Sequence, residues 1–462
     1  MRTYDAIIIG SGQAGTPLAK KLANAGYKTA LLEKHHIGGT CINTGCTPTK
    51  TMIASARLAF LAQQAQSLGI KIADVKVDLK KIINRKDKVV ESFREGSIKN
   101  LERVPGPDIY YGEASFSAEK TITLRSAHKK NIQLKAENIY INAGVTTTIP
   151  KIKGIKEIDY LTSTTILNIN TIPKHLLIIG GSYIALEFGQ MFSRFGSKVT
   201  VAEQFPEFLS REDEDVSAEL RNILEDEGIT ILTGTETKSL KTNSNKSITA
   251  VLNANGQRKT LTCSHVLIAA GRTPETEPLN LHLTGVKTDE KGYIKVNNNL
   301  ETNVKGIFAL GDIKGGPAFT HTSYNDHLVI AKNLLEKKSK GIKNRMVPYC
   351  MFTDPQLGRI GITEKEAKAK GIKYLVAMIK MDKVARAIET GDTRGLMKAI
   401  VDKKSKQILG AAVIGTEGGE VMTVLQMAMM GKVTYQQIRD GIFAHPTYSE
   451  SLNNLFMTLD KK

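Results

Sequence analysis

The sequence has 462 residues, about three times the ~100–150 residues of a typical domain, so we expect about two to four domains. Hydrophobic residues at 41% and charged residues at 24% are typical of globular proteins, which excludes collagen, a coiled coil and wholesale disorder. The longest apolar runs fall far short of the ~20 residues that cross a bilayer, and the N-terminus enters a strand pattern at once. We therefore expect a cytoplasmic protein with no membrane partner.

The net charge is strongly positive, since 64 Lys and Arg minus 46 Asp and Glu gives +18. Such an excess occurs in nucleic-acid-binding proteins, at anionic membranes, around anionic substrates and on plain Lys-rich surfaces. The lysine clusters at residues 76–88, 336–345 and 402–406 are interleaved with acidic or apolar residues, and the sequence has no Trp. We therefore favour a Lys-rich surface and expect no nucleic-acid partner.

The N-terminal segment has the pattern of a dinucleotide-binding module. Tyr4–Ile9 is almost wholly apolar, as expected of a parallel strand covered on both faces. The motif Gly-Ser-Gly-Gln-Ala-Gly at residues 10–15, a helical pattern and a second strand at Thr29–Leu32 follow, and Glu33 closes that strand. The glycines let the backbone approach a pyrophosphate at the helix N-terminus, and Glu33 can accept hydrogen bonds from the ribose.

The same pattern returns later in the chain. The strand Leu176–Ile179 leads into Gly-Gly-Ser-Tyr-Ile-Ala at residues 180–185, a helical pattern and a strand at Val199–Ala202, which Glu203 closes. The first glycine and the closing glutamate are 23 residues apart, as in the first module. Two modules imply two dinucleotides, and the economical reason to hold two is to pass a hydride between them.

The second module favours NADH over NADPH. Ala185 stands at the third glycine position, which leans towards NADP, but the charge of Glu203 would repel a 2′-phosphate. Lys198 and Arg211 are the nearby cations that could reverse this preference.

Cys41 and Cys46 are the candidate redox pair. On an ideal helix their Cα atoms would be roughly 8.7 Å apart, beyond the ~7 Å limit for a disulfide, so the segment must be distorted if the two are to bond. Gly45 supplies the backbone freedom for that distortion. Thr47 is expected to cap a helix that begins at Pro48 and continues as an amphipathic run through Ile53, Leu58 and Leu61.

A close cysteine pair in a chain with only four cysteines is more typical of catalysis than of a structural disulfide. Metal binding is the rival interpretation, with His35 and His36 as further ligands, but we expect no metal. We expect Cys263 and Cys350 to be buried or incidental.

The run Gly-Thr-Cys at residues 39–41 with Cys-Thr-Pro-Thr-Lys at 46–50 resembles the active-site signature of the FAD-dependent pyridine nucleotide–disulfide oxidoreductases. The likeness covers the whole chain and includes Leu-Gly-Asp at residues 310–312, similar to the second FAD motif of the family. It implies an α/β fold with two Rossmann-like dinucleotide-binding domains and a C-terminal α+β dimerisation domain. Asp312 would bind the ribityl chain, and Lys50 would lie near flavin N5 and pair with Glu187.

The residues expected to bind the two cofactors share a place in these motifs or in the short Ala-Gly segments at 143–144 and 270–271. They are Gly10, Gly12, Gly15, Glu33, Lys34, Gly39, Thr40, Lys50, Gly144, Gly180, Gly181, Ser182, Ile184, Glu187, Glu203, Gly271, Arg272, Gly311 and Asp312.

The segment Phe443–Glu450 resembles the C-terminal His-Glu motif of the family. Dithiol chemistry needs a base because only the thiolate attacks, and the imidazole of His445 is suited to carry that proton. Glu450 could orient the ring and stabilise the imidazolium. In the family this base reaches the cysteines of the other subunit, so the resemblance implies a homodimer.

Within the family, Gly180–Gly189 and Ala318–Tyr324 look most like the mercuric-reductase-like branch. The chain also resembles the flavoprotein that reduces hypothiocyanous acid and confers reactive-chlorine resistance, which shares the neighbourhoods Asp392–Gly395 and Ser449–Asn453. Two departures argue against mercury: no cysteine follows Cys350, whereas mercuric reductases end in a vicinal pair, and those enzymes lack the histidine that stands here as His445. Dihydrolipoamide dehydrogenase is an alternative, because it shares the His-Pro-Thr motif. A basic nucleic-acid-binding protein on a flavin-type fold is an alternative of another class, but it would not need the cysteine pair, Lys50 and His445 together.

The expected organisation is an FAD-binding domain at residues 1–145 and 270–345, an NAD(P)-binding domain at 146–269 and a dimerisation domain at 346–462. The expected reaction passes a hydride from NADH through FAD to the Cys41–Cys46 disulfide, which it enters at Cys46. Cys41 then attacks a small oxidised substrate, and His445 takes and returns the proton. Such an enzyme acts on a sulfur group or an equivalent acceptor and serves cell redox homeostasis.

Overall fold

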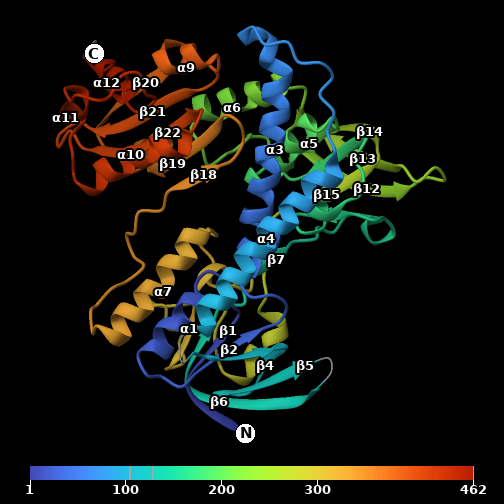
Figure 1. Cartoon of the computed structure of the whole chain (residues 1–462), viewed down its shortest axis with the longest axis vertical. Coiled ribbons are helices and arrows are strands. Elements are labelled where there is room, and N and C mark those ends of the chain that lie inside the picture. Colours follow the sequence, from blue (N-terminus) through green and yellow to red (C-terminus); the bar gives the residue numbers. More distant parts are fainter. Residues whose placement is uncertain (104–105, 127–128, 461–462) are drawn as a thin grey trace. The chain divides into compact units, whose positions relative to one another are not determined.

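The computed structural model describes residues 1–103, 106–126 and 129–460 (Figure 1). The chain divides into two compact units, each made of three stretches of sequence. Unit 1 comprises Met1–Thr51, Lys81–Thr148 and Gly271–Arg345, and unit 2 comprises Met52–Lys80, Ile149–Ala270 and Met346–Lys462.

The described part of unit 1 is built on a seven-stranded mixed sheet in the order β3-β2-β1-β6-β5-β4, with β17 paired to β6. Its strands are β1 (Arg2–Ile9), β2 (Thr29–Glu33), β3 (Asp108–Tyr111), β4 (Glu113–Ala118), β5 (Thr121–Ser126), β6 (Lys129–Ile141) and β17 (Ile307–Ala309). The pairs that join β3, β2, β1, β6 and β17 are parallel, whereas β4 and β5 add an antiparallel edge. Ile7 and Ile8 of β1 are fully buried, as expected of a parallel strand covered on both faces.

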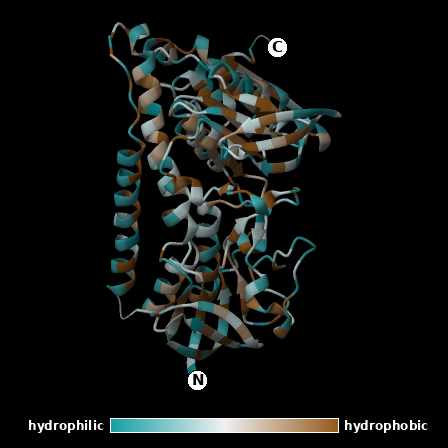
Figure 2. Cartoon of the chain, turned by 90° about the vertical axis from the view of Figure 1, so that its right-hand side faces the viewer, coloured by the Kyte–Doolittle hydropathy of each residue, from teal (hydrophilic) through white to brown (hydrophobic). Residues whose placement is uncertain are grey.

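Helices cover this sheet and also connect the two units along the chain. The helices wholly within unit 1 are α1 (Gly15–Asn24), α2 (Gly39–Thr44) and α7 (Thr320–Leu335), and the two-stranded sheet of β7 (Val145–Thr147) and β16 (Arg272–Pro274) completes the unit. Helix α3 (Cys46–Gln64) begins in unit 1 and ends in unit 2, while α4 (Leu79–Glu102) begins in unit 2 and lies mostly in unit 1. Charged residues are frequent along α4, which is largely teal in Figure 2.

Unit 2 contains a second parallel sheet, in the order β11-β10-β9-β15-β8. Its elements are β8 (Leu161–Thr162), β9 (His175–Ile179), α5 (Tyr183–Arg194), β10 (Lys198–Ala202), α6 (Glu214–Asp226), β11 (Thr230–Leu232) and β15 (His265–Ile268). An antiparallel sheet of β12 (Thr235–Thr242), β13 (Ile248–Ala254) and β14 (Gln257–Cys263) is inserted between β11 and β15.

The C-terminal part of unit 2 is an antiparallel sheet in the order β18-β19-β22-β21-β20. Its elements are β18 (Tyr349–Met351), β19 (Gln356–Gly361), α8 (Glu364–Ala369), β20 (Tyr374–Lys380), α9 (Ala385–Thr390), β21 (Leu396–Asp402), β22 (Ile408–Gly415), α10 (Gly418–Met430), α11 (Tyr435–Arg439) and α12 (Ser451–Met457). The short 3₁₀ turns of the chain are η1 (Ala65–Leu68), η2 (Ile155–Glu157), η3 (Thr165–Asn168), η4 (Glu277–Leu279), η5 (Leu281–Leu283), η6 (Gly311–Lys314) and η7 (Met381–Lys383).

The expected fold class is confirmed, and so is the repeated strand–glycine loop–helix–strand pattern. In each module the first strand pairs in parallel with the second, β1 with β2 and β9 with β10, and the helix between them starts at the glycine loop. One local expectation about α3 is wrong. The helix begins at Cys46, so Thr47 lies in its first turn instead of capping it. Leu58 and Leu61 of the expected amphipathic run are exposed on the single chain.

Among the described residues, no helix combines the length and apolar character that a membrane span requires.

Candidate active site

The first glycine loop brings backbone segments too close together for side chains at its glycine positions. A Cβ atom on Gly15 would lie 2.0 Å from the carbonyl oxygen of Gly10, and one on Gly39 would lie 2.6 Å from Cα of Gly12. Gly10 has φ +100°, a conformation that favours glycine. Together these residues form a bare backbone cradle at the start of α1, which fits the pyrophosphate of a dinucleotide.

Glu33 lies at the end of β2 with its carboxylate turned back to the same loop. Its Oε2 atom accepts hydrogen bonds from the backbone N–H of Ser11 at 3.0 Å and from the Ser11 hydroxyl at 2.5 Å, and Oε1 accepts from the N–H of His35 at 2.7 Å. These bonds fix the carboxylate beside the glycine loop, where a ribose would bind. Lys34 points to another partner, Glu113, at 2.9 Å.

The second glycine loop repeats this arrangement in unit 2. The Oε2 atom of Glu203 accepts a hydrogen bond from the N–H of Gly181 at 2.6 Å, and Oε1 accepts from the N–H of Phe205 at 2.9 Å. Gly180 has φ +107°, and Ser182 stands at the N-cap of α5 in an extended conformation. Ile184, also expected at this site, lies in the first turn of α5 and is half-buried. The loop therefore fits a second dinucleotide with a fixed carboxylate at its ribose end.

The cysteine pair sits on either side of a break between two helices. Helix α2 ends at Thr44, Gly45 adopts φ −130° and ψ −115°, and α3 begins at Cys46. A Cβ atom on Gly45 would lie 2.8 Å from the carbonyl oxygen of Thr40 and 3.3 Å from Cα of Cys41. The distortion expected from the spacing is present, and it depends on a glycine because the two turns approach each other here.

The two thiols are in contact, although they are not bonded in the structure. The hydrogen bond to Cys46, together with burial, raises the pKa of the Cys41 thiol. The Sγ atom of Cys46 also lies 3.3 Å from Oγ1 of Thr320, at the start of α7. Two thiols in contact do not readily lose both protons, because two adjacent thiolates would repel each other. A base is therefore needed to take up the proton of the thiol that attacks.

The turn η6 follows β17 and contains the expected second FAD motif. Gly311 has φ +70°, and a Cβ atom there would lie 2.8 Å from Oδ1 of Asn142. Burial raises the pKa of Asp312, while the positive charges of Arg272 and Lys314 oppose that rise. Asp312 accepts a hydrogen bond of 3.4 Å from the hydroxyl of Ser323.

The chain passes between the two units close to Gly144 and again at Gly271–Arg272. Arg272 begins β16, which pairs with β7, and its carbonyl oxygen accepts a hydrogen bond of 3.1 Å from the hydroxyl of Tyr293. Gly271 and Gly144 both have positive φ, +126° and +76°. These two glycines lie where the chain leaves and re-enters unit 1.

His445 and Glu450 form a pair in the loop before α12. The Nδ1 atom of His445 lies 3.0 Å and 2.9 Å from the two carboxylate oxygens of Glu450. The backbone N–H of Glu450 donates to the hydroxyl of Thr447 at 3.1 Å, which fixes the carboxylate in turn. The His445 side chain is 68% exposed, so its other nitrogen is open to a group from outside the chain.

Lys50 and Glu187 lie in different units, and their expected pairing stays a prediction. Lys50 is half-buried in α3 within unit 1. Glu187 is buried in α5 within unit 2, where its Oε1 atom accepts a hydrogen bond of 2.9 Å from the N–H of Phe352.

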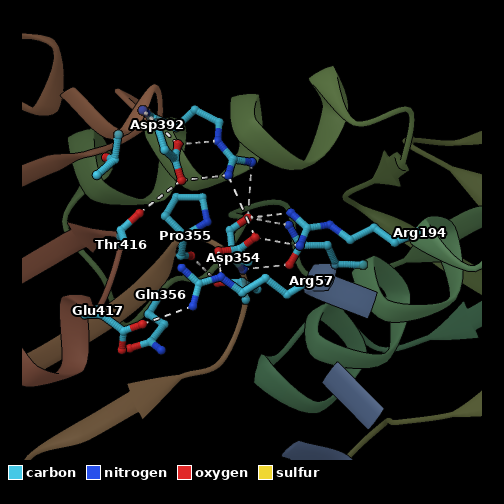
Figure 3. Close-up of polar contacts among 12 residues, drawn as sticks. Arg57, Arg194, Asp354, Pro355, Gln356, Asp392, Thr416 and Glu417 are labelled. Atoms are coloured by element: carbon cyan, nitrogen blue, oxygen red, sulfur yellow. Dashed lines mark hydrogen bonds and ion pairs between the residues drawn. The ribbon is translucent and has the colours of Figure 1, made fainter. Parts of the chain in front are cut away.

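The C-terminal half of α3 is anchored in unit 2 by a network of charges that no sequence motif indicates (Figure 3). Asp354 receives a hydrogen bond from Arg194 at 2.6 Å, and Nε of Arg57 lies 3.5 Å from its other oxygen. The ring of Phe60 lies under two guanidinium groups, with its centroid 3.9 Å from that of Arg194 and 4.9 Å from that of Arg394. The helix that begins with Cys46 is thus held three turns further on by buried ion pairs.

Comparisons with known proteins agree with this geometry. Residues 4–326 match the family model for pyridine nucleotide-disulphide oxidoreductase, and residues 347–456 match the model for the dimerisation domain of these enzymes. The chain is 36% identical to the probable pyridine nucleotide-disulfide oxidoreductase RclA of Escherichia coli, with 99% of each chain covered.

Other relatives have different activities. The chain is 33% identical to a mercuric reductase of Staphylococcus aureus, over 99% of this chain and 83% of that protein. It is also 33% identical to a dihydrolipoyl dehydrogenase of Thermus scotoductus, over 100% of this chain and 98% of that protein.

A solved structure extends the likeness to three dimensions. The Cu(II) complex of the HOCl-induced flavoprotein disulfide reductase RclA from Escherichia coli superposes with a TM-score of 0.91 at 35% identity, and the match covers 99% of this chain and 100% of that one. The paired glycine loops, the cysteines across a helix break and these matches along the whole length lead to one conclusion. The chain belongs to the pyridine nucleotide-disulphide oxidoreductase family and is a pyridine nucleotide-dependent flavin disulfide oxidoreductase.

Proposed function

We propose that this enzyme passes the electron pair of NADH to the Cys41–Cys46 disulfide and from the resulting dithiol to a small, thiol-reactive oxidant. The observation that supports it most directly is the contact between the two cysteines across the break at Gly45. A disulfide needs its Cα atoms within ~7 Å, and a broken helix makes that approach possible where a continuous one does not.

The residues proposed to hold the cofactors are the two glycine loops with their closing glutamates, the segments at Gly144 and Gly271–Arg272, and the turn with Asp312. Bound FAD supplies the two-electron chemistry that links the nicotinamide to the disulfide. Lys50, near the cysteine end of α3, is proposed to stabilise negative charge at the flavin. Asp312 is proposed to accept a hydrogen bond from the ribityl chain. It does so as a carboxylate, although burial raises its pKa.

The two cysteines have separate proposed roles. Cys46 receives electrons first, and its contact with Thr320 at the start of α7, the helix that follows the Asp312 turn, supports this order. Cys41 then attacks the oxidant as a thiolate at the atom bonded to its hydroxyl group, so that a bond to Cys41 forms, the bond to the hydroxyl oxygen breaks and the hydroxyl leaves as water. Cys46 attacks that adduct, so that the disulfide forms again and the substrate leaves reduced by two electrons.

The proposed base is His445. With Nδ1–H donating to Glu450, Nε2 is free to accept the proton of the attacking thiol and to return it to the reduced product. The exposure of the ring supports a role towards a second copy of the chain, as the dimerisation domain also does.

The preference for NADH is proposed from Glu203. Its carboxylate is fixed by two backbone N–H groups at the ribose end of the second loop. A 2′-phosphate there would meet a negative charge that cannot turn away, whereas a free 2′-hydroxyl could donate to it.

For the substrate, we propose a reactive chlorine species or hypothiocyanous acid. RclA, the relative with 36% identity, is described as HOCl-induced, and its solved structure holds Cu(II). We also propose a cytoplasmic homodimer with domains at residues 1–145 with 270–345, 146–269 and 346–462, and the +18 charge as a Lys-rich surface without a nucleic-acid partner.

The test is a substrate panel with purified enzyme, in which hypothiocyanous acid, lipoamide, glutathione disulfide, Hg(II) and Cu(II) are each offered with NADH and with NADPH. The proposal predicts the highest kcat/KM for hypothiocyanous acid with NADH. A higher value for lipoamide would instead support the dihydrolipoamide dehydrogenase alternative. In an anaerobic NADH titration, Cys46→Ser should abolish the long-wavelength absorbance of the reduced cysteine–flavin pair, and a retained band would refute the role of Cys46.

A further inference from the structure

Asp326 is a fully buried acid that belongs to none of the motifs above. It lies in α7, and its carboxylate has three partners. Oδ2 accepts a hydrogen bond of 2.8 Å from the backbone N–H of Gly311 and lies 3.2 Å from Nζ of Lys314, and Oδ1 accepts from Arg345 at 2.6 Å. A buried carboxylate is costly unless it is paired and hydrogen-bonded, so this position is built around its charge.

The first partner is the turn that contains the proposed FAD ligand. Gly311 is the first residue of η6, and the N–H groups at the start of a helical turn have no acceptor within that turn. Asp326 supplies the acceptor from a helix that follows in the chain. The hydrogen bond fixes the residue directly before Asp312 and therefore limits where the Asp312 side chain can point.

The second partner is a buried cation, Lys314, which belongs to the same turn as Asp312. The side chain of Lys314 is only 4% exposed, and its charge acts on both Asp326 and Asp312. Asp326 pairs with this ammonium group, whose charge lowers the pKa of Asp312, while the charge of Asp326 itself raises that pKa. The geometric effect of Asp326 is therefore to hold Lys314 and the turn in place. A buried lysine without Asp326 would be left partly unpaired next to the turn.

The third partner lies where the chain leaves unit 1. Arg345 is the last residue of that unit, and its guanidinium also donates to Oδ1 of Asn325 at 3.1 Å. The Asp326 carboxylate thus connects the turn Gly311–Lys314 to the last residue of unit 1.

We propose that Asp326 is a positioning residue for FAD: it holds the turn Gly311–Lys314 so that the Asp312 side chain is directed towards the ribityl chain. This inference rests on the proposed role of Asp312. It adds to that role a residue of α7 that acts through the backbone and through Lys314 without touching the cofactor.

The experiment measures FAD binding to apoprotein, by quenching of FAD fluorescence, and the visible circular dichroism of the bound flavin. Asp326→Ala should weaken FAD binding by about tenfold or more, the effect of losing a hydrogen bond to a charged group. It should also change the flavin circular dichroism. Asp326→Asn keeps an acceptor for Gly311 but not the charge, so it should lie between Asp326→Ala and the wild type, and it serves as the test variant if Asp326→Ala does not fold.

Asp354→Asn is the matched control, because Asp354 is also a buried acid with cationic partners but lies in unit 2. It should bind FAD with wild-type affinity and spectrum. Equal loss in this control would mean general destabilisation and would overturn the inference. Wild-type binding by Asp326→Ala would also overturn it.

Asp312→Asn separates the inference from the function on which it rests. If Asp312→Asn weakens FAD binding while Asp326→Ala does not, only the inference about Asp326 fails. If Asp312→Asn binds FAD like the wild type, the role of Asp312 is wrong and the proposed route through it fails as well.

Discussion

The Nδ1 atom of His445 lies 2.9 Å from Oε2 of Glu450, within one short loop before α12. A carboxylate at this distance favours the tautomer that has its proton on Nδ1, which leaves Nε2 as the acceptor. The pair is local in sequence, so it can form before any partner is present.

Replacing His445 by Gln should lower steady-state turnover by about 10²–10⁴-fold, the usual contribution of a general acid–base group. Reduction of the enzyme by NADH should keep its wild-type rate, because that half-reaction does not need the thiol proton to be exchanged with substrate. Rapid-mixing absorbance and steady-state assays measure the two separately. Glu450→Gln should have a smaller effect in the same direction. Unchanged turnover in His445→Gln would remove this histidine from the reaction.

Gly45→Ala should damage the cysteine site, because the new Cβ would lie 2.8 Å from the carbonyl oxygen of Thr40. Overpacking of this kind lowers the free energy of unfolding by about 1–3 kcal/mol, and we expect slower oxidation of the cysteine pair as well. Gly96→Ala is the control, since nothing lies within 4 Å of its Cβ position in α4 and alanine favours a helix. Urea unfolding and thiol titration provide the measurements. Equal behaviour of the two variants would contradict the close approach.

Glu203→Ala should reduce the discrimination between NADH and NADPH. Removing the fixed carboxylate takes away its repulsion of a 2′-phosphate and its acceptor for a 2′-hydroxyl, so kcat/KM should fall for NADH and rise for NADPH. We expect the ratio to change by about tenfold or more, which corresponds to one charged hydrogen bond. A wild-type enzyme that already prefers NADPH would refute the proposed role of this residue.

Asp354→Asn should lower the free energy of unfolding by about 3 kcal/mol, because it removes the carboxylate that pairs with the buried Arg194 and with the partly exposed Arg57. Lys99→Gln is the contrasting variant. Its pair with Glu95 is exposed on α4, and such pairs contribute about 0–1 kcal/mol. Chemical denaturation of both variants tests the difference, and similar small losses would show that the network around α3 adds little stability.

The pH dependence of stability should include a contribution from Glu212. Burial is the main reason why its pKa is raised from 4.5 to about 6, despite Arg359 at 3.3 Å and a hydrogen bond from Tyr349. Between these two values the folded state binds the proton more tightly than the unfolded state, so the free energy of unfolding falls as the pH rises. The loss amounts to about 2 kcal/mol and is complete above pH 6.

Glu212→Gln should remove this contribution. The difference in unfolding free energy between wild type and variant should therefore change by about 2 kcal/mol between pH 4.5 and pH 7, in the direction of a relatively more stable variant at pH 7. Urea unfolding across this range measures it. A constant difference would contradict the raised pKa.

The parts of the fold and site that could be predicted from sequence are those with local signals. The glycine loops, their closing glutamates and the break at Gly45 follow from residue types at short, fixed spacings. The predicted start of α3 was wrong by two residues, because Thr47 and Pro48 are as favourable within the first turn of a helix as at its boundary. The exposed faces of Leu58 and Leu61 could not be inferred from periodicity, which marks an apolar face without saying what covers it.

The functional contacts that the sequence did not reveal join residues far apart in the chain. Thr320 is 274 residues from Cys46, and Arg194 is 160 residues from Asp354. Neither pair belongs to a repeat or a spacing rule. Asp326 carried no compositional signal either, because it stands between the polar residues Asn325 and His327 in the first half of α7.

The exposure of His445 has a consequence for how the enzyme would respond to concentration. If the ring serves the cysteines of a second copy, a single chain has all the groups that accept electrons from NADH but lacks the base for the reaction with the substrate. Dilution into monomers would then silence turnover while leaving reduction by NADH intact. Mixing Cys41→Ser chains with His445→Gln chains would restore one working site in every mixed pair, so that complementation between two inactive proteins reports their association.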